Sequence, residues 1–131
     1  MQNNLKFYIN GEWIDPAVPA VIDVINPATE QPFTQISAGS AVDIDRAVVA
    51  ARAAFNSFSQ WSVKERLDLL ERIRSIYKTR FEDIAQAISN EMGAPIDMSR
   101  SSQTVIGMGH IKNAITILKD FEFETIESGM I

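Results

Sequence analysis

The N-terminal residues alternate between short apolar runs and turn residues, a pattern typical of β-strands. Two such runs, residues 7–9 and 12–14, flank the dipeptide Asn10-Gly11. A two-residue type I′ turn needs positive φ at both central positions, and Asn and Gly adopt positive φ more readily than other residues. The sequence therefore predicts a β-hairpin over residues 7–14.

A second pair of strands is predicted further along the same segment. Residues 21–25 are mostly β-branched, and Pro27 stops this run because proline has no N–H to donate to a strand partner. Residues 26–30 have the composition of a turn, and residues 33–36 return as a short strand. The first forty residues are thus expected to form a small antiparallel β unit.

From Ser40 onward, apolar residues recur at about 3.6 positions, which is the period of an α-helix. Ser40 and Asp43 have the spacing of a capping pair, in which each residue satisfies a free group at the helix start. The pattern that follows predicts a helix over about residues 41–56. Ser62 and Glu65 have the same spacing and open a second, longer helical pattern.

The longer pattern extends to Met92 and then meets Gly93 and Pro95, which are typical signals for the end of a helix. Thr79 and Glu82 have the spacing of a third capping pair inside this pattern. We therefore expect a kink or a break near Thr79 instead of one straight helix.

The C-terminal part begins with the serine-rich residues 99–102, which lead into a last predicted helix from about 105 to 121. This helix contains Gly107 and Gly109, although glycine costs roughly 1 kcal/mol in a helix interior. A close approach of another backbone or of a ligand would explain them. From residue 121 to 125, apolar and acidic residues alternate, which predicts a strand before a final turn.

Composition narrows the possible functions. The chain has 131 residues, 12 Lys+Arg and 17 Asp+Glu, for a net charge of −5, and no basic cluster of the kind that binds nucleic acid. It has no cysteine, which excludes a disulfide framework, a zinc ribbon and a thiol nucleophile within these residues. No long apolar stretch and no secretory leader are recognisable, so we expect a single-domain, soluble, cytoplasmic protein without membrane or nucleic-acid partners.

Few residues are candidates for chemistry. His110 is the one histidine, and a structural or solvent-facing role is favoured over a general base because the sequence indicates no orienting partner. Gly107-Met108-Gly109 has the spacing of two glycines of a dinucleotide-binding fingerprint. The third position is Lys112, however, and the segment does not follow a strand, so close helix packing is favoured.

Aromatic and acidic residues are interpreted mainly as structural. Phe55, Phe58 and Trp61 are expected in the core, with a ligand pocket as the alternative. The acidic residues opposite the apolar stripes are expected on solvated helix faces, some paired with a basic residue three or four positions away. These acidic residues are Glu65, Asp68, Glu71 and Glu82, and the basic partners considered are Lys64, Arg72 and Lys78. The residues alone thus indicate an α+β chain with short antiparallel strands and three to four amphipathic helices, without an active site.

Five groups of residues, taken together, resemble the N-terminal region of NAD(P)-dependent aldehyde dehydrogenases. In order along the chain they are Phe7-Tyr8-Ile9-Asn10-Gly11-Glu12-Trp13, Val24-Ile25-Asn26-Pro27-Ala28-Thr29-Glu30, residues 43–47 with 50–55, Arg66 with Leu69-Leu70, and Glu91-Met92-Gly93-Ala94-Pro95. Each motif alone is common, but their shared order and spacing over about ninety residues is specific. The resemblance implies about the first quarter of a subunit with the α/β fold of this family.

This resemblance also implies a domain and an activity. Residues 1–131 would be the N-terminal part of the cofactor-binding domain, ending at the start of the oligomerisation strands at about 121–131. The family oxidises an aldehyde to a carboxylic acid with NAD or NADP through a cysteine thiohemiacetal and a thioester. The catalytic cysteine and the cofactor-binding residues lie outside this chain, so the chain alone is expected to be inactive. The whole enzyme is expected to be a homodimer or homotetramer.

Two minor sites are implied by the same resemblance. Relatives hold a monovalent cation between a backbone carbonyl and an acidic side chain, which correspond here to Ile25 and Glu91; a plain surface role for Glu91 is the alternative. Ser102 and Ile106, together with Gly109 or Asn113, would border the aldehyde entrance tunnel, and a core position is the alternative for Ile106.

The sequence departs from the family pattern at two places, and two other functions stay open. Ala94 stands where a lysine is frequent, and Pro32 is expected to shorten its strand. The chain is alternatively a free-standing interaction module that has kept the helices without the chemistry. A different enzyme that uses His110 is a third hypothesis.

Overall fold

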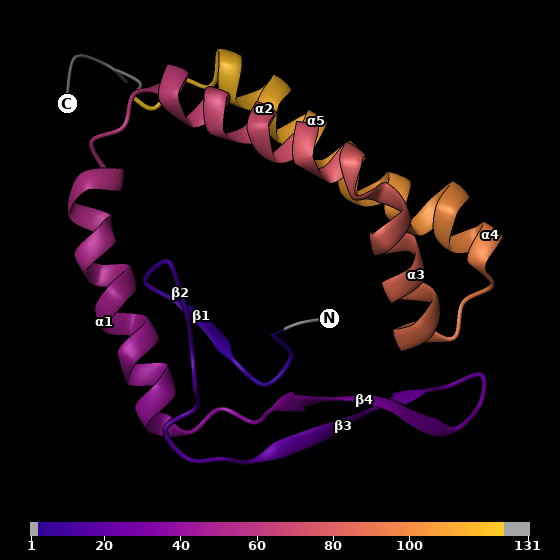
Figure 1. Cartoon of the computed structure of the whole chain (residues 1–131). Helices are drawn as coiled ribbons and strands as arrows, with labels where there is room; N and C mark the ends of the chain where they lie inside the picture. The colour runs from indigo at the N-terminus through magenta and orange to yellow at the C-terminus, as the bar shows by residue number, and fades with distance from the viewer. Residues whose placement is uncertain (1–2, 125–131) are drawn as a thin grey trace.

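The computed structural model describes residues 3–124, and its elements follow one another around an open arc (Figure 1). Four strands come first and helices follow. The strands are β1 (Phe7–Ile9), β2 (Glu12–Ile14), β3 (Val21–Asn26) and β4 (Gln31–Ser37). The helices are α1 (Ala41–Phe58), α2 (Val63–Thr79), α3 (Phe81–Met92), α4 (Ile96–Met98), the π-helical turn η1 (Ser99–Gln103) and α5 (Thr104–Asp120). This arrangement confirms the predicted α+β class.

Strands β1 and β2 form the predicted antiparallel hairpin, with Tyr8 opposite Trp13. Asn10 and Gly11 have φ values of 55° and 81°, so both central residues have the positive φ that the type I′ turn requires. The rings of Tyr8 and Trp13 lie 5.2 Å apart across the two strands. This aromatic pair stabilises a hairpin that has no third strand beside it among residues 3–124.

Strands β3 and β4 form a separate two-stranded antiparallel sheet. The turn between them is built by Asn26, whose side-chain oxygen accepts a hydrogen bond of 2.9 Å from the amide of Ala28. The expectation that Pro32 shortens its strand is wrong, because Pro32 lies within β4 opposite Ile25. The pairing register shifts at this point, and an irregular position tolerates a residue without an N–H.

The start of α1 depends on Asp43, which is the most buried charged residue described here, with 4% of its surface exposed. Its carboxylate accepts hydrogen bonds from the amide and the hydroxyl of Ser40, at 2.9 and 2.7 Å, as the capping pair predicted. It also accepts one from the amide of Ala17, at 2.9 Å. These bonds, above all the one from the Ser40 amide, lower the pKa of Asp43. Asp43 therefore ties α1 to the loop after β2.

The expected break in the long helical pattern is confirmed, but its predicted cause is wrong. Helix α2 starts at the Ser62–Glu65 capping pair and ends at Thr79, and Arg80 separates it from α3 with φ and ψ of −106° and 17°. The Thr79 hydroxyl donates to the carbonyl of Ile76 at 2.8 Å and caps nothing in α3. The Glu82 carboxylate instead binds Arg100, far along the chain.

Residues beyond α3 are more helical than the sequence predicted. Gly93 ends α3 in the left-handed conformation, with φ of 70°, as a C-terminal glycine is expected to do. The serine-rich segment is itself helical, since α4, η1 and α5 follow one another without a loop. Residues 121–124 do not form the predicted strand, and the remaining part of the proposed oligomerisation segment lies outside the described residues.

Helices α2 and α5 run side by side, and the contact is built around one tyrosine (Figure 1). The Tyr77 hydroxyl donates a hydrogen bond of 2.9 Å to the backbone carbonyl of Thr104. A Cβ atom at Gly107 would lie 2.5 Å from that hydroxyl oxygen, whereas one at Gly109 would meet nothing within 4 Å. The predicted close helix packing is therefore confirmed for Gly107, and Gly109 has no such packing role.

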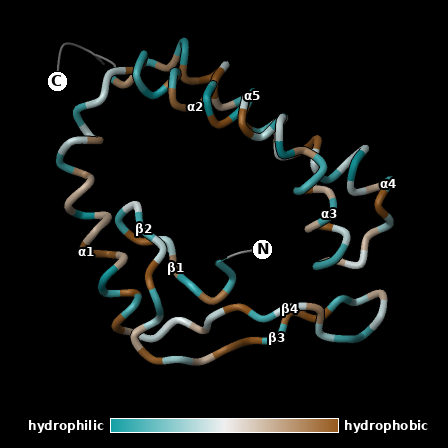
Figure 2. Tube along the Cα trace, viewed as in Figure 1, coloured by the Kyte–Doolittle hydropathy of each residue, from teal (hydrophilic) through white to brown (hydrophobic). Residues whose placement is uncertain are grey.

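The described residues bury very few apolar side chains. Ala85 and Ile115 are the two buried hydrophobic residues, while large apolar side chains stay exposed on every strand and every α-helix. Figure 2 shows hydrophobic stretches recurring along α1, α2, α5 and β3. The accessible surface is 9969 Å², against about 6,900 Å² for a compact monomeric protein of 14.6 kDa. No helix within residues 3–124 is long and apolar enough to cross a membrane.

We predict that the 131-residue polypeptide made on its own will bind a hydrophobic dye strongly and will unfold without a cooperative transition. Its apolar faces have too few partners to hold a single packed state. Dye fluorescence, differential scanning calorimetry and sedimentation velocity would measure this. A monomer that unfolds in one sharp transition would contradict the prediction and favour the free-standing interaction module.

We predict that Gly107→Ala, measured in a complete protein in which these helices have their packing partners, will loosen the contact between α2 and α5, because the added methyl group collides with Tyr77. Overpacking of this kind costs about 1–3 kcal/mol, which corresponds to hydrogen exchange of the α5 amides about 5- to 150-fold faster. Gly109→Ala is the matched control, and its exchange should be unchanged or slower because alanine favours helix. Equal exchange in both variants would show that Tyr77 does not limit the approach of α5.

Candidate functional site

The turn between β3 and β4 meets the end of α3, and the two segments carry the residues proposed to hold a cation. Gly93 packs on this turn so closely that a Cβ atom there would lie 3.1 Å from the Cβ of Pro27 and 3.3 Å from the amide nitrogen of Ala28. Ile25 lies in β3 just before the turn, and Glu91 lies in the last turn of α3. The fold therefore brings the two segments together.

The donors at this junction are oxygen atoms, which suit a hard cation. Ile25 offers a backbone carbonyl and Glu91 an exposed carboxylate. Two donors are only part of a coordination shell, and residues 3–124 contain no group of three His, Asp or Glu side chains that could hold a metal ion. The cation site stays a prediction, and it would need further ligands besides these two residues.

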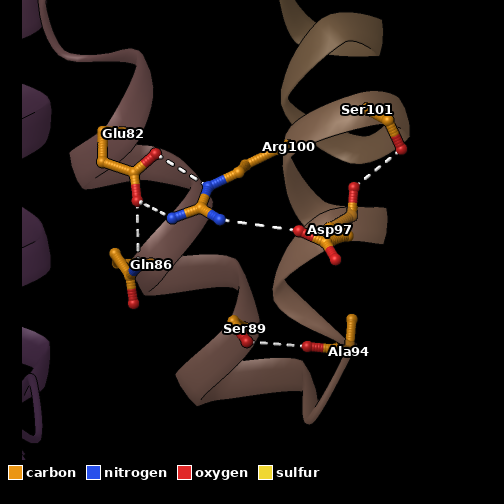
Figure 3. A network of polar contacts seen from close by, with 7 residues as sticks. All are labelled: Glu82, Gln86, Ser89, Ala94, Asp97, Arg100 and Ser101. Atoms are coloured by element: carbon orange, nitrogen blue, oxygen red, sulfur yellow. Dashed lines mark hydrogen bonds and ion pairs between the residues drawn. The ribbon is translucent and has the colours of Figure 1, made fainter.

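The segment after α3 is held against α3 by polar contacts, shown in Figure 3. The Ser89 hydroxyl donates to the carbonyl of Ala94 at 2.7 Å, which fixes the reversal of the chain after Gly93. Further along, Arg100 in η1 binds both carboxylate oxygens of Glu82, at 3.0 and 2.6 Å. Sequence reasoning missed this pair because the partners are 18 positions apart, so no local spacing pattern indicates it.

The candidate tunnel residues lie at the junction of η1 and α5. Ser102 is half-buried within η1, and Ile106 follows one helical turn later with 50% of its surface exposed. The alternative of a core position for Ile106 is therefore wrong within the described residues. Gly109 and Asn113 follow on α5, Gly109 half-buried and Asn113 exposed. The role of these residues toward a substrate stays a prediction.

The structure also places His110 and the segment Gly107-Met108-Gly109. His110 is exposed on α5, which agrees with the solvent-facing interpretation. Gly107-Met108-Gly109 lies in the interior of α5 and follows a helix instead of a strand. A dinucleotide fingerprint needs these glycines between a strand and the start of a helix. This segment therefore does not have the geometry of a phosphate-binding loop.

The prediction that Phe55 and Phe58 lie in the core is wrong for the described residues, since they are 65% and 43% exposed. The ring of Phe58 lies 5.1 Å from that of half-buried Trp61, and the Arg66 guanidinium lies 5.5 Å from the Phe58 ring centre. Arg66 also donates to the carbonyls of Trp61 and Ser59, each at 3.2 Å. Arg66 therefore organises the connection between α1 and α2.

The acidic helix faces are solvated as expected, but most partners differ from those considered. Lys64 and Asp68 form a contact of 2.6 Å, four positions apart, as the pattern indicated. Glu71 pairs with Arg74 at 3.3 Å, which is three positions away but was not among the basic partners considered. Exposed pairs of this type contribute little to stability. They are surface features and do not define a site.

Comparison with known proteins agrees with the resemblance noted in the sequence. A model of the aldehyde dehydrogenase family matches residues 13–130. The 3-succinoylsemialdehyde-pyridine dehydrogenase of a Pseudomonas species is 41% identical over 125 residues, which cover 95% of this chain and 26% of that protein. Both the family prediction and the predicted share of a subunit, about a quarter, are confirmed.

Solved structures show the same relationship. An aldehyde dehydrogenase from Bartonella henselae is 46% identical and superposes with a TM-score of 0.93 over 99% of this chain and 28% of its own. Aldehyde dehydrogenase C from Pseudomonas syringae, solved as a mutant with NAD+ and octanal, is 43% identical with a TM-score of 0.93 over 97% of this chain and 26% of its own. The chain spans about a quarter of the length of these relatives, and it belongs to the aldehyde dehydrogenase family.

Proposed function

We propose that this chain is the N-terminal part of the cofactor-binding domain of an enzyme that oxidises an aldehyde to a carboxylic acid with NAD+ or NADP+. The observation that carries the proposal is the family match over residues 13–130, together with identities above 40% to aldehyde dehydrogenases four times as long. The exposed apolar faces agree with it, since they fit a chain whose helices pack against further polypeptide.

The chemistry of this family needs groups that these residues do not supply. The sequence has no cysteine, so the thiolate that attacks the aldehyde has to come from outside this chain. The glycines of α5 lie within a helix and do not form a dinucleotide-binding loop. We therefore assign no catalytic step and no cofactor contact to residues 3–124. Their proposed role is to support the domain and to contribute residues to the edges of its binding sites.

We propose that four of these residues contribute to two sites, a cation site and the path by which the aldehyde enters. The carbonyl of Ile25 and the carboxylate of Glu91 contribute to a monovalent cation site, supported by the close packing of Gly93 on Pro27. Ser102 and Ile106 face the path by which the aldehyde enters, supported by the exposure of Ile106 next to a polar turn. The whole enzyme is proposed to be a cytoplasmic homodimer or homotetramer.

The activity is tested with two proteins, the 131-residue polypeptide and a chimera in which it replaces the matching quarter of the Pseudomonas syringae enzyme. Intact-mass spectrometry first establishes the length of each. We expect no aldehyde-dependent NAD(P)H formation from the polypeptide and measurable formation, with octanal and NAD+, from the chimera. The chimera without its catalytic cysteine is the control. Activity of the polypeptide alone, or an inactive chimera that folds and assembles, would contradict the proposal.

The cation site is tested in the same chimera with Glu91→Gln, which removes the negative charge and keeps one oxygen donor. We expect the variant to need a several-fold higher potassium concentration for half-maximal stabilisation, measured by thermal unfolding in potassium chloride against N-methylglucamine chloride. Glu71→Gln is the matched control, since Glu71 pairs with Arg74 on α2 away from this junction. The same potassium dependence in both variants would remove Glu91 from the site.

A further inference from the structure

The π-helical turn η1 is the irregular feature of the C-terminal half. Its amide-to-carbonyl bond joins Thr104 to Ser99, five residues apart, where an α-helix bonds residues four apart. A π-turn holds one extra residue compared with an α-helical turn and is rarely stable without support. Ser99 and Thr104, which this bond joins, are completely buried, and their hydroxyls have no hydrogen-bond partner within residues 3–124. The side chains at the two ends of the turn therefore add no hydrogen bond to it, which leaves its support to contacts with neighbouring elements.

Two side-chain contacts tie the turn to other elements. One is the hydrogen bond from Tyr77 to the carbonyl of Thr104. The other is the two-pronged contact between Arg100 and Glu82, whose side chains are 44% and 56% exposed (Figure 3). Arg100 donates from Nε to Oε2 at 3.0 Å and from Nη2 to Oε1 at 2.6 Å, and its Nη1 lies 3.5 Å from Asp97 Oδ1. Gln86 donates to Glu82 at 2.9 Å and holds the carboxylate from the other side. A bidentate guanidinium contact fixes direction as well as distance, which a single-point contact does not.

The position of η1 decides how the residues on either side of it face one another. Each residue of an α-helix advances the chain by about 100° around the axis. If η1 relaxed into an α-helical turn, the residues before it would rotate by about that angle relative to α5. Ser102 lies within the turn and Ile106 lies on the first turn of α5. Residues four positions apart share a face in either geometry, but the direction of that face relative to α3 depends on the turn staying π-helical.

We propose that Arg100 is a positioning residue for aldehyde entry, because its paired contact with Glu82 holds η1 on α3 and so fixes the face formed by Ser102 and Ile106. The proposal rests on the proposed function, which gives that face its substrate. Arg100 itself is not assigned a contact with the aldehyde. Its effect is on how well the entering aldehyde is held, while the reacting groups belong to other parts of the enzyme.

The test uses the complete, assembled chimera with Arg100→Gln. Arg100→Lys is the milder variant, because lysine keeps the charge but cannot form the two-pronged contact. We expect KM for octanal to rise about 3- to 10-fold in Arg100→Gln and less in Arg100→Lys. The values of kcat and of KM for NAD+ should stay within about twofold. Arg80→Gln is the matched control, since Arg80, between α2 and α3, forms an exposed contact of 3.2 Å with Asp83 in the first turn of α3.

A double variant tests whether Arg100 acts through its contact with Glu82 or independently of it. If Arg100 acts through Glu82, the variant with both Glu82→Gln and Arg100→Gln should have the same octanal KM as Arg100→Gln. Hydrogen exchange of the Thr104 amide, which donates to the Ser99 carbonyl, should be faster in Arg100→Gln and in the double variant than in the parent chimera.

Hydrogen bonds from Arg100 hold the pKa of Glu82 at about 2, below its usual 4.5, so the contact persists as pH falls until that range is reached. The KM difference should thus be the same from pH 6 to pH 8.

Each outcome has a separate meaning. An octanal KM in Arg100→Gln equal to that in Arg80→Gln, in an active chimera, would overturn the positioning role and leave the proposed function intact. Equal losses in kcat, in both KM values and in thermal stability would also overturn it, since they would show a general structural role. Should Arg100→Gln not fold, Arg100→Lys decides by the same comparison. A folded parent chimera without activity would instead reject the proposed function.

Discussion

The shortage of internal partners for apolar side chains constrains the whole structure. A helix with hydrophobic residues around most of its circumference is normally buried on more than one side. Helix α1 carries Ile44, Val49 and Phe55, each more than 60% exposed, and Asp43 is its one buried residue. Its position is set by capping and polar contacts at its first turn, while its apolar surface stays exposed within residues 3–124.

Polar contacts at a few junctions therefore decide how the elements sit. Asp43 joins the first turn of α1 to the loop after β2, and Ser37 joins β4 to the N-terminal segment through the carbonyl of Leu5. Tyr77 joins α2 to α5, and Arg100 joins η1 to α3. Each contact is directional, so it fixes an orientation that two weakly packed surfaces would leave undetermined. The arc in Figure 1 is held at these points more than by a continuous core.

The sequence predicted the features whose causes are local. Asn10-Gly11, the Ser62–Glu65 pair and the Gly93 stop all act within a few residues, and each is found where the pattern indicated. The errors arose where a distant residue competes. Glu82 was expected to cap a helix next to Thr79 but binds Arg100 on a different element, because a two-pronged charged contact is stronger than a capping bond.

The prediction that certain aromatic residues are buried was wrong for a different reason. Helical spacing of Phe55 and Phe58 correctly indicates an apolar face, but periodicity contains no information on which residues cover that face. The same limit applies to Ser102 and Ile106, whose placement depends on a π-turn that no sequence pattern announced. A resemblance over several motifs assigned the family because it compares whole arrangements, whereas the residues taken singly indicated only an α+β chain.

The distribution of these features gives the chain a consistent role within its family. Several of its polar contacts lie at turns and helix ends, and most of its large apolar side chains are exposed within residues 3–124. A chain that carried out chemistry by itself would need a water-excluded site with converging polar groups, and water is excluded by packed apolar surface. Residues 3–124 have the polar junctions but not that surface. This combination agrees with the proposed role at the edge of a site whose interior would belong to other parts of the enzyme.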